Sequence, residues 1–253
     1  MPSDQEACLM TELGLFLSSE EHAGSCLARQ AQEAEESGFG AVLISDHYHP
    51  WLDEQGHSPF VWSVLGAIAN DTRLRVTTGV TCPTVRTHPA VIAQASATVA
   101  EMSEGRFRLG VGTGEALNEH ITGSRWPPAD VRLDMLEEAV AVMRMLWRGE
   151  TVTHRGPHYT VEGARIYEKP TQPIPVVVSG FGPKAVNLAA RIGDGYVTVK
   201  PDAESVNRYR DAGGHGPAVA GMKVCFGPDR DRAVALAYQR WRTDGVPGEL
   251  NQI

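Results

Sequence analysis

Cysteine, long apolar runs and positive charge are all scarce in this sequence of 253 residues. Its four scattered cysteines (Cys8, Cys26, Cys82, Cys225) form no C-x-x-C pair, which favours a reduced, cytoplasmic chain without disulfides. No apolar run reaches the ~18–20 residues of a membrane span, and the first residues do not read as a signal peptide. The net charge of −8, from 23 basic and 31 acidic residues, argues against nucleic-acid or anionic-membrane partners.

The sequence has an ordinary apolar content of 42% and more glycine than usual. The 26 glycines are about 10% of the chain, against a usual ~7%, and indicate many turns or backbone that approaches a ligand closely. No linker, repeat or low-complexity tract divides the chain. We therefore expect one domain over residues 1–253, with a hairpin-like insertion near 151–170.

Short apolar runs alternate with longer segments of helical period. We expect strands at 13–17, 41–44, 74–80, 107–111, 176–178, 196–199 and 222–226. We expect helices between and after them, at 20–37, 60–69, 89–103, 133–147, 184–192, 203–212 and 231–243. This alternation predicts an α/β fold with a parallel sheet.

A doubly wound sheet and a (β/α)₈ TIM barrel share this alternation. The length near ~250 residues, and polar loops after several successive strands, favour the barrel. Seven strands are counted where a closed barrel has eight, so the prediction is a barrel shortened at its C-terminus.

The loop after the second expected strand is rich in chemistry, because Ser45–Trp51 contains Asp46, His47 and His49, and His57 follows. His47 could act as a general acid or base, since an imidazole titrates near neutral pH. The three histidines could instead ligate a metal, or they could simply bond to backbone groups.

Two glycine-rich loops follow later strands. Gly110, Gly112 and Gly114 lead to Glu115, with Asn118 and Glu119 one turn on, which suits a flat ligand or an ordinary turn. The segment 179–184 (Ser-Gly-Phe-Gly-Pro-Lys) precedes a helix and could cradle a phosphate, or again be an ordinary turn. Arg86 and Lys200 also fall in these loops and could meet an anion.

These motifs occur together with Gly-His-Ser-Pro-Phe at 56–60 and Pro-Ala-Val-Ile-Ala-Gln-Ala at 89–95. From about residue 11 onward the chain resembles the luciferase-like oxidoreductases, and within them the coenzyme F420-dependent glucose-6-phosphate dehydrogenase group. The resemblance implies a TIM barrel, a homodimer, and hydride transfer between a deazaflavin and a secondary alcohol or sugar-phosphate carbinol.

The resemblance also implies roles for single residues. His47 would accept the proton of the substrate hydroxyl, Glu115 would exchange a proton with the deazaflavin ring, and Trp51 would pack at the reacting centre. Gly79–Val80 falls where the family has a non-proline cis peptide, and Lys200 would bind substrate. The residues implied to contact the cofactor are Asp46, Gly79, Val80, Cys82, Thr113, Gly114, Asn118, Phe181, Gly182 and Lys184, and no metal is implied.

Three other interpretations stay open at this point. One is an FMN-dependent monooxygenase of the same superfamily, and another is a metal-dependent hydrolase that uses His47, His49 and His57. The third is a truncated barrel without catalytic activity.

Overall fold

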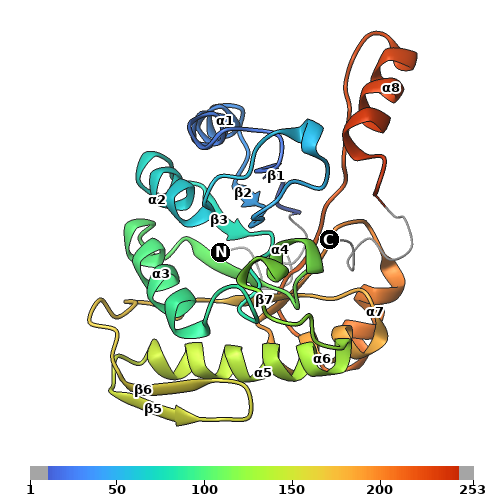
Figure 1. The fold of residues 1–253 in the computed structure, drawn as a ribbon. Coiled ribbons are helices and arrows are strands. Elements are labelled where there is room, and N and C mark those ends of the chain that lie inside the picture. The colour runs from blue at the N-terminus through green and yellow to red at the C-terminus, as the bar shows by residue number, and fades with distance from the viewer. Residues whose placement is uncertain (1–10, 245–253) are drawn as a thin grey trace, which may run out of the picture.

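Seven parallel strands form the central sheet of the computed structural model, which describes residues 11–244 (Figure 1). In spatial order they are β1 (Gly14–Leu17), β2 (Ala41–Ile44), β3 (Arg75–Thr78), β4 (Phe107–Val111), β7 (Val176–Ser179), β8 (Gly195–Thr198) and β9 (Ala218–Ala220). Each strand pairs with the next one along the chain, apart from the two hairpin strands between β4 and β7. A doubly wound sheet reverses its order at a switch point, so this order identifies a barrel arc.

Helices cover the outer face of the arc (Figure 1). They are α1 (Gly24–Glu36), α2 (Val61–Asp71), α3 (Pro89–Met102), α5 (Ala129–Leu146), α6 (Pro183–Ile192) and α7 (Ala203–Asp211). Apolar strand residues such as Val176 and Val178 are fully buried in the core that these helices share with the sheet. The continuous apolar character of the strands therefore reflects cover on both faces.

Helix ends follow the predicted local signals. Pro89 occupies the first turn of α3, and the preceding His88 caps it by accepting a hydrogen bond from the Ala90 amide at 3.1 Å. The end of α1 is marked by Gly38, whose φ of +88° is the left-handed conformation that favours glycine. Its amide and that of Phe39 donate to carbonyls in the last turn of the helix.

The excursion predicted near 151–170 is a two-stranded antiparallel hairpin of β5 (Val152–Arg155) and β6 (Thr160–Ala164). The carboxylate of Glu138 on α5 anchors it. This side chain accepts hydrogen bonds from the amides of His158 and Tyr159, both at 3.0 Å, and lies 2.8 Å from Nε2 of His154. The hairpin is thus an addition attached to the helical layer.

The seventh strand is not where the sequence predicted it. β9 is Ala218–Ala220, and the predicted strand at 222–226 is irregular and exposed, with Phe226 fully accessible. Alternating Met222, Val224 and Phe226 resemble a strand, but a strand also needs a partner, and β8 pairs with 218–220 instead.

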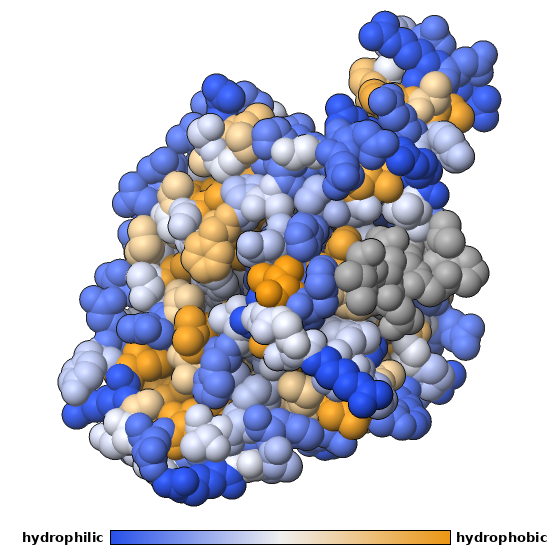
Figure 2. Space-filling view, viewed as in Figure 1, coloured by the Kyte–Doolittle hydropathy of each residue, from blue (hydrophilic) through white to orange (hydrophobic). Residues whose placement is uncertain are grey.

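The chain after β9 leaves the body of the protein. Helix α8 (Arg230–Trp241) projects from the barrel (Figures 1 and 2), and its C-terminal end bonds to the loops after β1 and β2. Nε2 of Gln55 donates to the Arg240 carbonyl at 3.0 Å, and Nε1 of Trp241 donates to Oε2 of Glu21 at 3.2 Å. The helix has no buried residue. The prediction of one domain over residues 1–253, shortened at its C-terminus, includes residues 245–253. These residues lie outside the described part of the chain.

Candidate functional site

The carboxyl ends of the parallel strands bring several predicted site residues to one edge of the arc. Asp46, His47 and Trp51 follow β2, and Gly79, Val80 and Cys82 follow β3. Thr113, Gly114, Glu115 and Asn118 follow β4, then Phe181, Gly182 and Lys184 follow β7, and Lys200 follows β8. This is the edge where barrels carry their functional loops.

His47 sits in an enclosed position, with its side chain only 9% exposed. Its Nδ1 atom lies 3.4 Å from Oε1 of Glu20, and within residues 11–244 it has no hydrogen bond of normal geometry. The Trp51 ring meets the imidazole edge-on, with 5.1 Å between centroids. The imidazole therefore has a carboxylate on one side and an apolar wall on another, an arrangement suited to accepting and holding a proton.

Glu20, in the loop after β1, is the site residue that sequence reasoning missed. Its Oε2 atom accepts hydrogen bonds from the hydroxyls of Ser18 at 3.0 Å and Ser45 at 2.7 Å, so the carboxylate is buried but held. The available signal was the polar run Ser18-Ser19-Glu20 directly after the first strand. The sequence predicts a helix from residue 20, which would place Glu20 in its first turn, whereas the helix begins at Gly24 and leaves Glu20 in the loop.

Asn118 ties the loop after β4 to the histidine loop. Its Oδ1 atom accepts hydrogen bonds from the amides of Tyr48 at 2.8 Å and His49 at 3.0 Å. Its Nδ2 atom faces Oε2 of Glu115 at 3.4 Å. Glu115, the residue before α4 (Ala116–Glu119), is thereby held at the same edge of the arc as His47.

A glycine-rich wall lies at the ends of β3 and β4. The peptide Gly79–Val80 is cis, as the resemblance predicted. A Cβ atom at Gly112 would come within 2.9 Å of the Val80 side chain. At Gly114 the φ of +89° and a 2.9 Å approach to Glu119 also require glycine. Cys82 is buried beside this wall, and burial, with Glu115 and Glu119 nearby, raises the pKa of its thiol, so it stays neutral.

Two predicted anion-binding lysines are placed differently from these residues. The Lys184 ammonium bonds to both carboxylate oxygens of Asp130 on α5, at 2.8 and 2.9 Å, in a groove of about 250 Å³ between α5 and α6. Lys200 is exposed, and among the described residues no hydrogen bond or ion pair joins its ammonium to the His47 loop. Phe181 is half-exposed.

The histidines do not converge on a metal site. Nδ1 of His49 donates to the Leu117 carbonyl at 2.9 Å, and its ring stacks on His120. Across residues 11–244, no three His, Cys, Asp or Glu side chains are grouped as metal ligands would be. The interpretation as a hydrolase using His47, His49 and His57 therefore lacks the geometry it requires.

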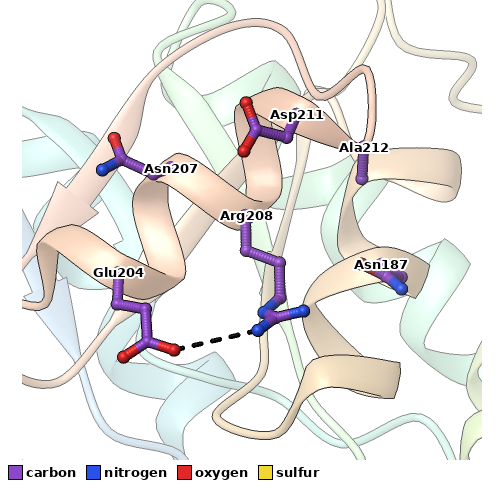
Figure 3. A pocket seen from close by; sticks show the side chains of 6 residues that line it. All are labelled: Asn187, Glu204, Asn207, Arg208, Asp211 and Ala212. Atoms are coloured by element: carbon purple, nitrogen blue, oxygen red, sulfur yellow. Dashed lines mark ion pairs between the residues drawn. The ribbon is translucent and has the colours of Figure 1, made fainter.

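A surface hollow of about 700 Å³ lies elsewhere, between α6 and α7 (Figure 3). It is lined by Asn187, Glu204, Asn207, Arg208, Asp211 and Ala212, with an ion pair of 3.8 Å between Glu204 and Arg208. None of the predicted site residues lines it. Its polar, exposed lining offers no reactive group comparable to His47.

The singly wound arc and the polar groups at its strand ends define a protein of the TIM-barrel class. The sequence model described as "Luciferase-like monooxygenase" matches residues 7–251. The chain belongs to this luciferase-like family.

Two proteins of known activity are similar to the chain. The chain is 43% identical over 260 residues to an F420-dependent glucose-6-phosphate dehydrogenase of Nakamurella multipartita, covering 94% of this chain and 76% of that protein. It is 36% identical to an F420-dependent hydroxymycolic acid dehydrogenase of Mycobacterium tuberculosis, covering 95% of this chain and 70% of the other.

A solved structure is also similar. An F420-dependent secondary alcohol dehydrogenase in complex with an F420-acetone adduct superimposes with a TM-score of 0.90 at 35% identity. The alignment covers 96% of this chain and 78% of that one.

Within residues 11–244, no helix combines the length and apolar character that crossing a membrane requires.

Proposed function

We propose that the protein is an oxidoreductase that transfers a hydride between coenzyme F420 and a secondary alcohol or sugar-phosphate carbinol. The observation that carries the proposal is the enclosed pair of His47 and Glu20, 3.4 Å apart, at the strand ends. The F420-dependent dehydrogenases among its relatives, which act on a sugar phosphate, a hydroxymycolic acid and a secondary alcohol by name, support it.

The residues present fit such a coenzyme. A deazaflavin ring is flat, and Gly79, Gly112 and Gly114 add no side chain of their own to the backbone at these strand ends. Their Cβ positions lie 2.9 Å from the side chains of Phe16, Val80 and Glu119, so the backbone and these side chains are packed closely into one wall. The ring would lie against this wall and the cis peptide, contacted by Val80, Cys82, Thr113 and Asn118. When bound, it supplies the carbon that accepts the hydride.

His47 is the proposed general base. Oxidation of a carbinol requires removal of the hydroxyl proton, and the imidazole would hold that proton after the transfer. The Glu20 carboxylate would orient the ring and stabilise its protonated form, since an opposite charge a few ångströms away favours the cation. Trp51 would exclude water from the reacting centre.

Glu115 is the proposed partner on the coenzyme side. Asn118 holds its carboxyl at 3.4 Å, and this carboxyl would exchange a proton with the ring nitrogen of the bound coenzyme. An imidazole on the substrate side and a carboxyl on the coenzyme side would let each reactant change its protonation locally.

The loop 179–184 is the proposed site for the phosphate of the coenzyme. The amides that open α6 are free of a side-chain cap at Gly182, and a helix N-terminus attracts anions. Lys184 would exchange Asp130 for the phosphate, at small cost because that ion pair is exposed. Lys200 would bind the substrate.

We also propose that the protein forms a homodimer and that it works in the cytoplasm. Four cysteines without a C-x-x-C pair agree with a reducing compartment.

Titration with oxidised F420, followed by intrinsic tryptophan fluorescence, tests the proposal on wild type and on Gly182→Asp. Gly182 has φ −95°, and a Cβ there meets nothing within 4 Å, so aspartate fits without strain. As an N-cap it stabilises α6 slightly, by roughly 0.2–0.5 kcal/mol relative to glycine. We expect micromolar binding by wild type, and at least ~10-fold weaker binding by a variant that melts no lower.

The outcomes separate the alternatives. Binding of FMN but not F420, with oxygen consumption, would identify the monooxygenase instead. Binding of neither flavin would support a barrel without catalytic activity. Equal F420 affinity in wild type and Gly182→Asp would remove the phosphate site from 179–184 and leave the His47 assignment standing.

A further inference from the structure

Arg86, in the loop between β3 and α3, lies between two buried carboxylates. Its Nη2 atom donates to Oδ1 of Asp46 at 2.9 Å, and its Nε atom lies 3.8 Å from Oε1 of Glu119. The side chains of Arg86, Asp46 and Glu119 are 12%, 5% and 1% exposed. One nitrogen of the guanidinium is thus bonded to Asp46, while Nε faces Glu119 and is buried without a hydrogen-bond partner within residues 11–244.

The Arg86 side chain also holds the backbone of the histidine loop. The same Nη2 atom donates to the Asp46 carbonyl at 3.2 Å, so this one nitrogen contacts both the side chain and the main chain of Asp46. The other carboxylate oxygen of Asp46 accepts a hydrogen bond from the Thr81 hydroxyl at 2.7 Å. Both oxygens of Asp46 are therefore occupied within the protein, directly before His47.

Glu119 holds Arg86 from the opposite side. Its Oε2 atom accepts hydrogen bonds from the amides of Val85 at 3.2 Å and Arg86 at 2.6 Å. It lies on α4, one turn after Glu115. The chain of contacts from Glu119 through Arg86 to Asp46 connects the loop that carries Glu115 with the loop that carries His47.

We propose that Arg86 is a positioning residue for His47, fixing the loop 45–51 relative to Glu115 through Asp46 and Glu119. The inference rests on the proposed function only for its kinetic consequence. Two proton-handling groups on different loops work together only if the loops keep their separation, and a displacement near 1 Å can cost ~10²-fold in rate.

The test compares Arg86→Gln and Arg86→Lys with Arg73→Gln, which removes an arginine whose side chain is 72% exposed. Amide hydrogen exchange without coenzyme reports directly on residues 45–51, including the amides that donate to Asn118. We expect exchange there to rise at least ~10-fold in Arg86→Gln and to stay unchanged in Arg73→Gln. In Arg86→Lys, which keeps the charge and loses the fork, we expect an intermediate value.

F420 affinity and the single-turnover rate with a secondary alcohol complete the test. Arg86→Gln should keep F420 affinity within ~3-fold and lose ~10–100-fold in the rate, with partial recovery in Arg86→Lys. If Arg86→Gln does not fold, Thr81→Val removes the other bond to Asp46 without stranding a charge. It should then shift exchange and rate in the same direction, by less.

Unchanged exchange at 45–51, or an equal loss of affinity and rate, would overturn the positioning role. Failure of the wild type to bind F420 would overturn the proposed function, while the exchange experiment would still decide whether Arg86 holds the loop.

Discussion

At the scale of single residues, His47 owes its environment to side chains that are far from it in sequence. Glu20 approaches from the loop after β1, and the hydroxyls of Ser18 and Ser45 satisfy the second oxygen of that carboxylate. A buried carboxylate is costly unless hydrogen bonds compensate it. The hydroxyls of Ser18 and Ser45 supply those hydrogen bonds to Glu20 beside the imidazole.

Replacing Glu20 by Gln tests this arrangement. The amide keeps the volume and removes the charge that stabilises a protonated imidazole, so we expect hydride transfer from a secondary alcohol to F420 to slow ~10²-fold, with F420 affinity little changed. Single-turnover kinetics measure the effect. Glu21→Gln is the matched control, because that carboxylate faces the Trp241 indole instead. Equal rates in both variants would contradict the role of Glu20.

Glu119 predicts a pH dependence of stability. Burial raises its pKa from 4.5 to about 7, against the opposing effect of Arg86 and the amides that donate to it. Between these pH values the folded protein binds more protons than the unfolded chain, so its free energy of unfolding falls as pH rises through this range.

Glu119→Gln should remove that dependence while its amide oxygen still accepts the two backbone hydrogen bonds. Relative to this variant, the free energy of unfolding of wild type should fall by up to about 3 kcal/mol between pH 4.5 and 7. It should change little above pH 7. Urea unfolding at pH 5, 6, 7 and 8 measures the difference. A constant difference across the series would show that Glu119 titrates normally.

At the scale of elements, the hairpin β5–β6 braces the loop that carries Arg86. The Tyr159 hydroxyl lies 3.0 Å from the carbonyls of Pro83 and of Thr84. Burial raises the pKa of Tyr159, so the hydroxyl keeps its proton and remains a donor. The insertion outside the barrel is thereby connected to the loop between β3 and α3.

Tyr159→Phe leaves two buried carbonyls without this donor and should lower the free energy of unfolding by about 1–2 kcal/mol. Tyr167→Phe, at a side chain 84% exposed, should change it by less than about 0.5 kcal/mol. Chemical denaturation of both variants provides the measurement. Similar values for the two would mean that the hairpin does not brace the loop through Tyr159.

Strand prediction succeeded where the apolar run was buried on both faces, as in Val176–Ser179, because such runs differ from their surroundings. It failed at 222–226, where alternation of Met222, Val224 and Phe226 imitates a strand without any pairing partner among the described strands. An alternating pattern shows only that a segment is compatible with a strand. Whether it pairs with another strand depends on the rest of the chain.

At the scale of the whole molecule, stability resides in the arc and its helical layer. Leu136 on α5 is fully buried in that core, whereas Leu236 on α8 is 46% exposed. The two residues are the same type on two helices, one packed and one projecting (Figure 1). They form a matched pair for locating the cooperative unit.

Leu136→Ala should reduce the free energy of unfolding by about 2–5 kcal/mol, through lost transfer energy and the cavity left behind. Leu236→Ala should cost less than about 0.5 kcal/mol. Urea unfolding followed by far-UV circular dichroism measures both. A large loss in Leu236→Ala would show that α8 packs against the body of the protein in solution.

The sequence by itself determined the family, the alternation of strands and helices, and the loops in which His47, Glu115 and the glycines lie. These features are local, since periodicity, turn chemistry and short motifs lie within a few residues of each other. The cis peptide at Gly79–Val80 followed from the resemblance and is confirmed.

Only the tertiary structure decided which loops meet. It placed Glu20 against His47, set Arg86 between Asp46 and Glu119, and turned Lys184 toward Asp130. Each of these contacts joins loops that follow different strands or helices. Their partners are chosen by the register and curvature of the sheet, which no local window of sequence contains.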